Sequence, residues 1–154
     1  MNKFYTIAIA ILFSLSFSGC SKESFQERII GTWQLEDVDR VGWGGNNRDH
    51  PFKNGTFTFV ESGSLTWVDP TGTNYKGTWQ IRKNNISGGC NTDGNGITTC
   101  NNRQVKSLMI TAIDFNNQDI RSEYFEEMDF NGNNRFKAYV EVGNKRYVFY
   151  FRRQ

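Results

Sequence analysis

Short segments in which apolar and polar side chains alternate, each bounded by turn residues, are the feature that most constrains this fold. The clearest case is the segment 74–82, in which Tyr75, Trp79 and Ile81 alternate with polar residues. Strict alternation predicts a β-strand with one buried face and one solvated face. Since no segment beyond residue 31 sustains the 3.6-residue period of a helix, the sequence predicts an all-β fold.

Eight such segments follow one another, separated by turn signals of which Asn131-Gly132 is the strongest. The predicted strands are residues 31–40, 55–60, 64–69, 74–82, 104–113, 119–130, 135–142 and 146–152. Sequential strands with short links predict an antiparallel up-and-down meander that closes into an eight-stranded barrel. A β-sandwich is the alternative, because the number of strands alone does not establish closure. Before the first strand, a capping box predicts a short helical turn over 25–30.

The first nineteen residues have the organisation of an export signal. Lys3 precedes an apolar run of about a dozen residues, too short to span a bilayer as a helix but suited to a signal-peptide core. The run ends in Ser18-Gly19-Cys20, which resembles the lipobox of bacterial lipoproteins, with Phe17 in place of the usual Leu. The resemblance implies cleavage before Cys20 and attachment of diacylglyceryl and acyl (for example palmitate) groups to it. An ordinary secreted protein with a cysteine near its cleavage site is the alternative.

This reading divides the chain into a signal peptide (1–19), a lipid-anchored tether with a helical turn (20–30) and one β-domain (31–154). Two or three acyl chains hold a protein firmly to a bilayer, so we expect a domain anchored in the cell envelope, on the periplasmic face or the cell surface. About 135 residues remain after cleavage, enough for a single domain. The net charge of +2 argues against a nucleic-acid-binding domain, which needs a basic field.

Cys90 and Cys100 remain after Cys20, and an even pair in an exported chain favours a disulfide. The residues between them are rich in Gly and Asn, so we expect an unordered loop. Closing such a loop stabilises the fold by about 3 kcal/mol on the chain-entropy model. A metal site is disfavoured, because the only histidine, His50, lies in a polar segment where we expect a surface residue. No cofactor is expected.

Gly31-Thr32-Trp33, at the start of the first strand, resembles the Gly-x-Trp signature of lipocalins. Together with the short helical turn, a second Gly-Thr-Trp at 77–79 and eight strands, it is similar to the lipocalin-like domains of small bacterial lipoproteins. The resemblance covers about 28–154. In lipocalins the Trp closes the barrel base and an Arg near the last strand packs across it. The resemblance therefore implies that Arg152, or its neighbour Arg153, packs on Trp33.

An eight-stranded barrel is either filled by its own side chains or holds one small ligand. The candidates for lining a ligand cavity, or for filling the interior, are Phe57, Trp67, Tyr75, Trp79, Tyr124 and Phe136. Trp43 lies among glycines and polar residues, and is a candidate rim contact for a glycan or a membrane, or a cover for the barrel mouth.

The expected function is a non-catalytic, membrane-anchored, lipocalin-like lipoprotein that binds a small hydrophobic ligand in or at the mouth of the barrel. The alternative is a structural or accessory lipoprotein with a filled barrel that binds an envelope protein or a glycan. The sequence has no recognisable nucleophile, metal cluster or carboxylate pair, so we do not expect an enzyme. We expect a monomer that contacts the membrane through Cys20.

Overall fold

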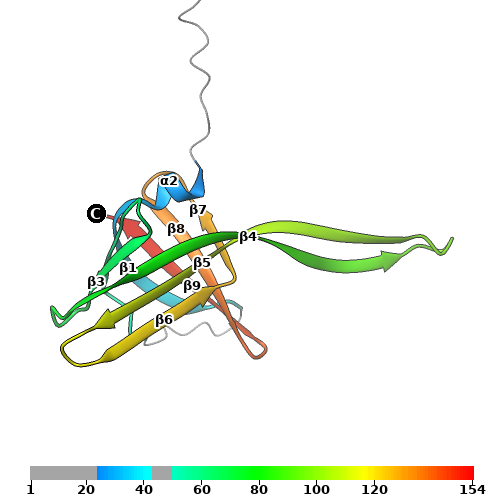
Figure 1. The fold of residues 1–154 in the computed structure, drawn as a ribbon. Coiled ribbons are helices and arrows are strands. Elements are labelled where there is room, and N and C mark those ends of the chain that lie inside the picture. Colours follow the sequence, from blue (N-terminus) through cyan, green and yellow to red (C-terminus); the bar gives the residue numbers. More distant parts are fainter. Residues whose placement is uncertain (1–23, 43–49) are drawn as a thin grey trace, which may run out of the picture.

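The alternating segments of the described chain pair into one antiparallel sheet of nine strands, preceded by a short helix (Figure 1). The structure is a computed structural model that describes residues 24–42 and 50–154. The predicted signal peptide, Cys20 and Trp43 lie outside the described residues. The elements are α2 (Phe25–Ile29), β1 (Gly31–Arg40), β2 (Thr56–Phe59), β3 (Ser64–Val68), β4 (Asn74–Thr92), β5 (Thr98–Asp114), β6 (Asp119–Phe125), β7 (Glu127–Phe130), β8 (Arg135–Val142) and β9 (Lys145–Arg153).

The strands lie in the order β6-β5-β4-β3-β2-β1-β9-β8-β7, so that the first strand pairs with the last. The predicted all-β antiparallel fold is confirmed, and β1 and β8 have the predicted bounds. Within the described residues the hydrogen-bonded sheet is not closed, because β6 and β7 are its two edge strands. The closed barrel and the β-sandwich both stay predictions.

The described chain has nine strands rather than the predicted eight because the segment 119–130 changes partner at Glu126. Residues before Glu126 form β6 and pair with β5, whereas those after it form β7 and pair with β8. At the break, the backbone amide of Glu126 donates to the carbonyl of Tyr139 over 3.0 Å. β7 also lies beside β5. The two edge strands are therefore the two halves of one bent segment.

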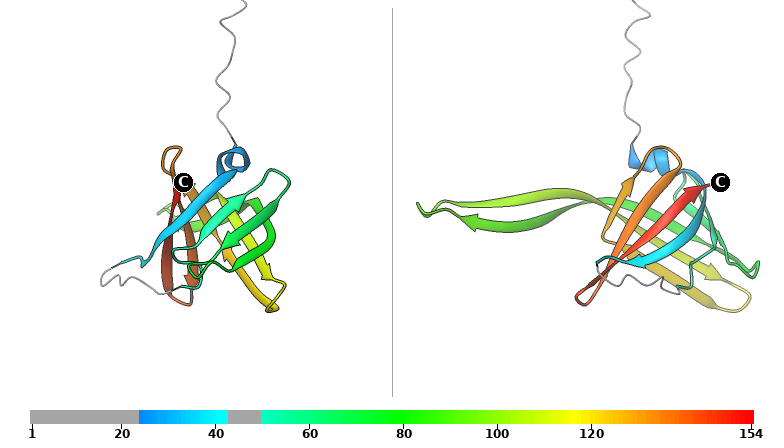
Figure 2. Two further views of the ribbon diagram at one scale, coloured as in Figure 1. Left: turned by 90° about the vertical axis from the view of Figure 1, so that its left-hand side faces the viewer. Right: turned by 180° about the vertical axis from the view of Figure 1, so that it is seen from behind.

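One cluster of buried side chains forms the core of the curled sheet, which Figure 2 shows from two further directions. The strands contribute alternate residues to this core as predicted, such as Trp33 and Leu35 from β1 and Phe57 and Phe59 from β2. Burying alternate side chains of every strand on one side supplies the apolar area that stabilises the sheet.

α2 packs over one end of this core. It begins with the predicted capping box, in which the Glu27 amide donates to Ser24 Oγ over 3.2 Å and the Ser24 amide donates to the Glu27 carboxylate over 2.6 Å. Its Ile29 side chain is fully buried. The indole nitrogen of Trp33 donates to the carbonyl of Ile29 over 2.7 Å, which ties the end of the helix to the first strand.

β4 and β5 continue beyond the rest of the sheet as a long two-stranded projection, which Figures 1 and 2 show reaching away from the core. We define residues 84–105 as the arm. From Asn84 to Thr92 the arm extends about 26 Å at roughly 3.3 Å per residue. At its tip, the Asp93 carboxylate accepts hydrogen bonds from the backbone amides of Asn95 and Ile97, which fixes the turn.

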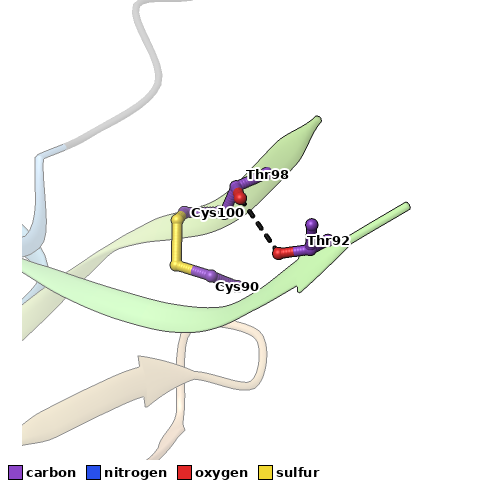
Figure 3. Close-up of a disulfide and its surroundings, with 4 residues drawn as sticks. All are labelled: Cys90, Thr92, Thr98 and Cys100. Atoms are coloured by element: carbon purple, nitrogen blue, oxygen red, sulfur yellow. Dashed lines mark hydrogen bonds between the residues drawn. A yellow bond between two sulfur atoms is a disulfide. The ribbon is translucent and has the colours of Figure 1, made fainter. Parts of the chain in front are cut away.

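The predicted disulfide between Cys90 and Cys100 is present, and it joins residues that face each other in the arm with their Cα atoms 4.0 Å apart. Nearer the tip, the hydroxyls of Thr92 and Thr98 are hydrogen-bonded over 2.9 Å (Figure 3). The prediction of an unordered loop here is wrong, because the strands stay paired out to these threonines. Asn and Gly favour turns, but a covalent link between facing strands reduces the conformational entropy that strand pairing must overcome.

Candidate functional site

Arg153 and Trp33 form the base of the fold. The guanidinium carbon of Arg153 lies 4.3 Å from the centre of the Trp33 ring, within the range of a cation–π contact. Arg153 also donates to the carbonyls of Arg28 and Ile30, over 2.6 and 2.9 Å. These carbonyls belong to the C-terminal turn of α2, which lacks partners of its own. Arg153 therefore holds the helix, the first strand and the last strand together.

Gly31 is required by the same contact. Its φ of 122° is one that residues with a side chain rarely adopt. A Cβ at this position would lie 2.6 Å from Nη1 of Arg153. The Gly-x-Trp motif thus has a local physical basis: the glycine makes room for the guanidinium that packs on the tryptophan.

Arg152, the other candidate for this contact, does not take part in it. Successive side chains of a strand point to opposite faces, so Arg152 lies on the outer face, where its Nη1 is 2.9 Å from Oε1 of Glu36. The alternation of the last strand favours Arg153 over Arg152 for this contact. Phe149 and Phe151 are buried, and Arg153 lies on the same face of the strand because it is an even number of residues away from them.

The predicted cavity residues mostly pack against aromatic rings. The ring centroids of Trp67 and Tyr75 are 4.3 Å apart, and those of Phe136 and Phe151 are 4.2 Å apart in a stacked arrangement. Rings at these distances are in direct contact. Five of the six predicted residues are at most 9% exposed, namely Phe57, Trp67, Tyr75, Trp79 and Phe136. These five side chains belong to the core cluster.

Tyr124, the sixth predicted cavity residue, lies on the outer face and is 43% exposed. The cause is the change of partner at Glu126, which reverses the alternation within the segment 119–130. In β6 the buried residue, Phe125, has an odd number, whereas in β7 the buried residues, Met128 and Phe130, have even numbers. Because the period of a strand is two, one irregular residue sends the side chains that follow it to the opposite face.

A pocket of about 510 Å³ lies where the segment before β2, the β3–β4 turn and β6 meet. It is lined by His50, Pro51, Lys53, Asn54, Asp69, Pro70, Thr71 and Arg121. Most of these side chains are polar or charged. An apolar ligand gains little in such a site, because desolvating unpaired polar groups opposes binding.

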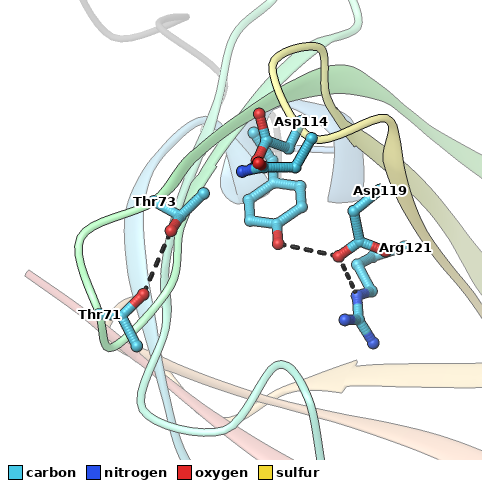
Figure 4. Close-up of polar contacts among 7 residues, drawn as sticks. Thr71, Thr73, Asp114, Asp119 and Arg121 are labelled. Carbon is cyan, nitrogen blue, oxygen red and sulfur yellow. Dashed lines mark hydrogen bonds and ion pairs between the residues drawn. The ribbon is translucent and has the colours of Figure 1, made fainter.

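A network of hydrogen bonds fixes the polar groups beside this pocket (Figure 4). The Tyr75 hydroxyl and Nε of Arg121 both donate to Oδ2 of Asp119, over 3.0 and 2.8 Å. Burial, followed by the hydrogen bond to Asp119, raises the pKa of Tyr75 above 10.0. The Asn117 side chain donates to Asp114 over 2.6 Å and holds the pKa of that carboxyl below 3.8. Tyr75 is therefore protonated, and Asp114 ionised, at neutral pH.

His50 is not the surface residue that the sequence predicts, since its side chain is only 13% exposed. Its Nε2 lies 3.1 Å from Oε2 of Glu123, and Nδ1 accepts a hydrogen bond from the Phe52 amide. Its ring meets the edge of Phe149 with centroids 4.9 Å apart. His50 thus links the segment before β2 to β6 and to the core. No sequence signal pointed to this role, because the partners are far apart along the chain.

Val105 is buried where the arm meets the sheet, and most of the other described side chains of the arm are exposed. Residues 98–104 are all exposed. β4 pairs with β3 only over 74–78, and β5 pairs with β6 only from residue 108 onward. In the described part of the chain, the outer edges of the arm therefore carry backbone N–H and C=O groups that no further strand ladder occupies. Such edges are templates for pairing with another chain.

The root of the arm is fixed to the rest of the fold by side chains. Nδ2 of Asn84 is hydrogen-bonded to the hydroxyls of Ser107 and Tyr124, over 3.0 and 2.9 Å. Nη2 of Arg103 lies 2.8 Å from Oε2 of Glu127 in β7. The arm therefore has a defined direction where it leaves the sheet.

The chain matches no protein-family model, no curated protein and no solved structure. Across residues 24–42 and 50–154, no three His, Cys, Asp or Glu side chains come together in a group that could hold a metal ion. The same residues include no helix that is long and apolar enough to cross a bilayer.

Proposed function

We propose that this protein is a non-catalytic lipoprotein of the cell envelope, anchored through Cys20, that binds a partner protein through its arm. The observation that carries this proposal is the arm itself: 22 residues, 84–105, that leave the sheet as a paired hairpin with both edges unoccupied. An isolated two-stranded hairpin is marginally stable in water. Here the disulfide between Cys90 and Cys100 stabilises such a hairpin, although the hairpin contributes little to the core.

The packed interior favours this function over transport of a small hydrophobic ligand. A carrier needs an empty apolar cavity, whereas the residues predicted to line one contact other rings. The pocket that includes His50 and Arg121 is polar. We therefore place binding on the outside of the domain.

The chemistry of the arm favours a partner that adds a strand. Exposed strand edges are ordinarily protected by charged residues, and residues 84–105 contain only two, Asp93 and Arg103. In strand addition, hydrogen bonds to the main chain supply affinity, and alternate side chains supply specificity. Ile86 in β4 and Ile97 in the turn at the tip, which are 39% and 62% exposed, offer apolar contacts to such a partner.

We further propose that the sheet closes as a lipocalin-like barrel through the bent segment β6–β7. Three observations support this: β6 and β7 are continuous at Glu126, β7 lies beside β5, and Arg153 packs on Trp33 at the base. Proton–proton NOEs between the backbones of β5 and β7 would test closure. Their absence would favour a sandwich.

Site-specific crosslinking in intact cells tests the role of the arm. We expect a photoreactive amino acid at Asn102 to give one discrete adduct, and the same amino acid at Ser122, which is exposed on β6, to give none. The crosslinked partner, once purified, should bind the full chain. No adduct at Asn102, or the same adduct at Ser122, would contradict the proposal.

A shortened arm provides the matched variant. Asn84 and Val105 face each other in the ladder, so an Asn-Gly turn can replace residues 85–104 between them. No residue of the removed segment belongs to the core cluster. We expect this variant to keep the thermal stability of the domain and to lose the partner. Partner binding that survives the truncation would overturn the assignment.

A further inference from the structure

A second pocket, of about 410 Å³, lies where the arm leaves the sheet, between α2 and the facing strands β4 and β5. Its lining combines two kinds of side chain, positively charged and apolar. It consists of Ser24, Phe25, Gln26, Arg28, Ile81, Lys83 and Lys106.

Lys83 and Lys106 are directly opposite each other in the β4–β5 ladder, and their side chains therefore share one face. Like charges in this position destabilise a sheet. Burial and the neighbouring charge of Lys83 lower the pKa of Lys106 below 10.5. The repulsion between the two lysines lowers the stability of the free protein, and an anion bound between their ammonium groups would reduce it.

The described residues supply no such anion. The six ion pairs in this part of the chain leave Lys83, Lys106 and Arg28 without a carboxylate within 4.0 Å. Arg28 lies over the ring of Phe130, with 4.3 Å between the guanidinium carbon and the ring centre, and donates to the Gly132 carbonyl. Three cationic groups thus border one pocket, with their charges unbalanced by acidic side chains.

The other wall of the pocket is apolar. Ile81 is 8% exposed, and the Phe25 ring meets Phe130 edge-on with centroids 5.2 Å apart. Nζ of Lys106 lies 5.9 Å from the centre of the Phe25 ring. A ligand that fills this site needs a negative group at one end and an apolar part beside it.

We propose that this pocket binds the phosphate group of an amphiphile. A phosphate offers several charged oxygens to the lysines and to Arg28, and lysine ammonium groups bind phosphate as compact point charges. Ser24 lines the pocket and is only four residues along the chain from the predicted anchor Cys20. A phospholipid headgroup is the source that this position favours. The choice of a lipid headgroup rests on the proposed anchor at Cys20, whereas the site itself does not depend on the proposed role of the arm.

Thermal unfolding of the full chain in non-ionic detergent tests the site. Two probes separate the sources of phosphate: inorganic phosphate, compared with chloride at equal ionic strength, and phosphatidylglycerol in the micelles, compared with diacylglycerol. We expect the Tm to rise by about 4 °C at ten times the Kd. A shift with phosphatidylglycerol supports the proposal and identifies a lipid headgroup, whereas a shift with inorganic phosphate alone identifies a free phosphate and contradicts the amphiphile.

Three variants complete the test. Lys83→Gln and Lys106→Gln should abolish the shift, and should unfold at the same Tm as the parent or higher without ligand, because the repulsion is relieved. Lys76→Gln, an exposed position on the same strand outside the pocket, should keep the shift. No shift with either probe, or the same shift in Lys83→Gln and Lys106→Gln as in the parent, would overturn the proposal. Both results are independent of whether the arm captures a partner.

Discussion

Arg153 packs its guanidinium 4.3 Å from the centre of the Trp33 ring while donating to two carbonyls at the end of α2. The contact joins residues from the two ends of the described chain, and Gly31 leaves the space for it. A single side chain thereby connects β1, β9 and α2, so its loss should affect the whole domain.

Replacing Arg153 with Ala should lower the free energy of unfolding by about 2–3 kcal/mol, because the cation–π contact and charged hydrogen bonds are lost together. Arg152→Ala is the matched control. Arg152 makes one exposed ion pair with Glu36 and should cost less than about 1 kcal/mol. Urea denaturation of both variants measures the difference. If both variants lost the same free energy of unfolding, the contact of Arg153 with Trp33 would contribute no more to stability than the exposed ion pair of Arg152.

Gly77, the glycine of the second Gly-Thr-Trp, is required for a different reason. A Cβ at this position would lie 1.8 Å from the Thr111 carbonyl oxygen in the neighbouring strand, a backbone atom that cannot move aside alone. Gly77→Ala should therefore destabilise the domain by more than about 3 kcal/mol. Gly89→Ala adds a Cβ with no heavy atom within 4 Å and should change stability by less than about 0.5 kcal/mol. Thermal unfolding distinguishes the two; similar Tm values would contradict the packing argument.

The alternation of apolar side chains was sufficient to predict most of the sheet. It placed β1 and β8 at their observed bounds, and it identified Trp33, Phe57 and Phe136 as core residues. These positions are predictable because one face of each strand is buried, which fixes the register and the parity of the side chains.

The sequence-based predictions are wrong where the alternation of apolar and polar residues reverses within a segment or is absent. The reversal at Glu126 arises because the segment 119–130 pairs with β5 before this residue and with β8 after it. A single alternating pattern over the whole segment does not reveal this switch, and it therefore places Tyr124 on the wrong face. Among the described side chains of the arm only Val105 is buried, so the sequence shows no apolar alternation there, and its Asn- and Gly-rich strands cannot be told from a loop. The pocket of Lys83 and Lys106 required knowledge of the β4–β5 register, which brings the two lysines opposite each other.

Tyr75 predicts a specific dependence of stability on pH. Burial and the hydrogen bond to Asp119 raise its pKa in the folded state above 10.0. The folded state thus keeps a proton that the unfolded state releases. The stabilisation is fully present below pH 10 and is lost as the pH rises through the folded-state pKa. Tyr75→Phe, which cannot titrate, should show a shallower loss of unfolding free energy as the pH rises above 10.0. Parallel pH profiles in urea denaturation would count against this account.

The disulfide should stabilise the arm rather than the domain. Residues 84–105 make few contacts with the core, so the arm can open while the rest of the sheet stays folded. Replacing both Cys90 and Cys100 with Ser should therefore remove amide exchange protection from the arm. The global free energy of unfolding should fall by less than about 1 kcal/mol, well below the 3 kcal/mol or so of the chain-entropy model. Hydrogen exchange followed by mass spectrometry, with β1 and β9 as internal controls, measures both effects. If protection fell equally in β1, β9 and the arm, the arm would be part of the cooperative core, and its assignment as a separate binding element would lose its physical basis.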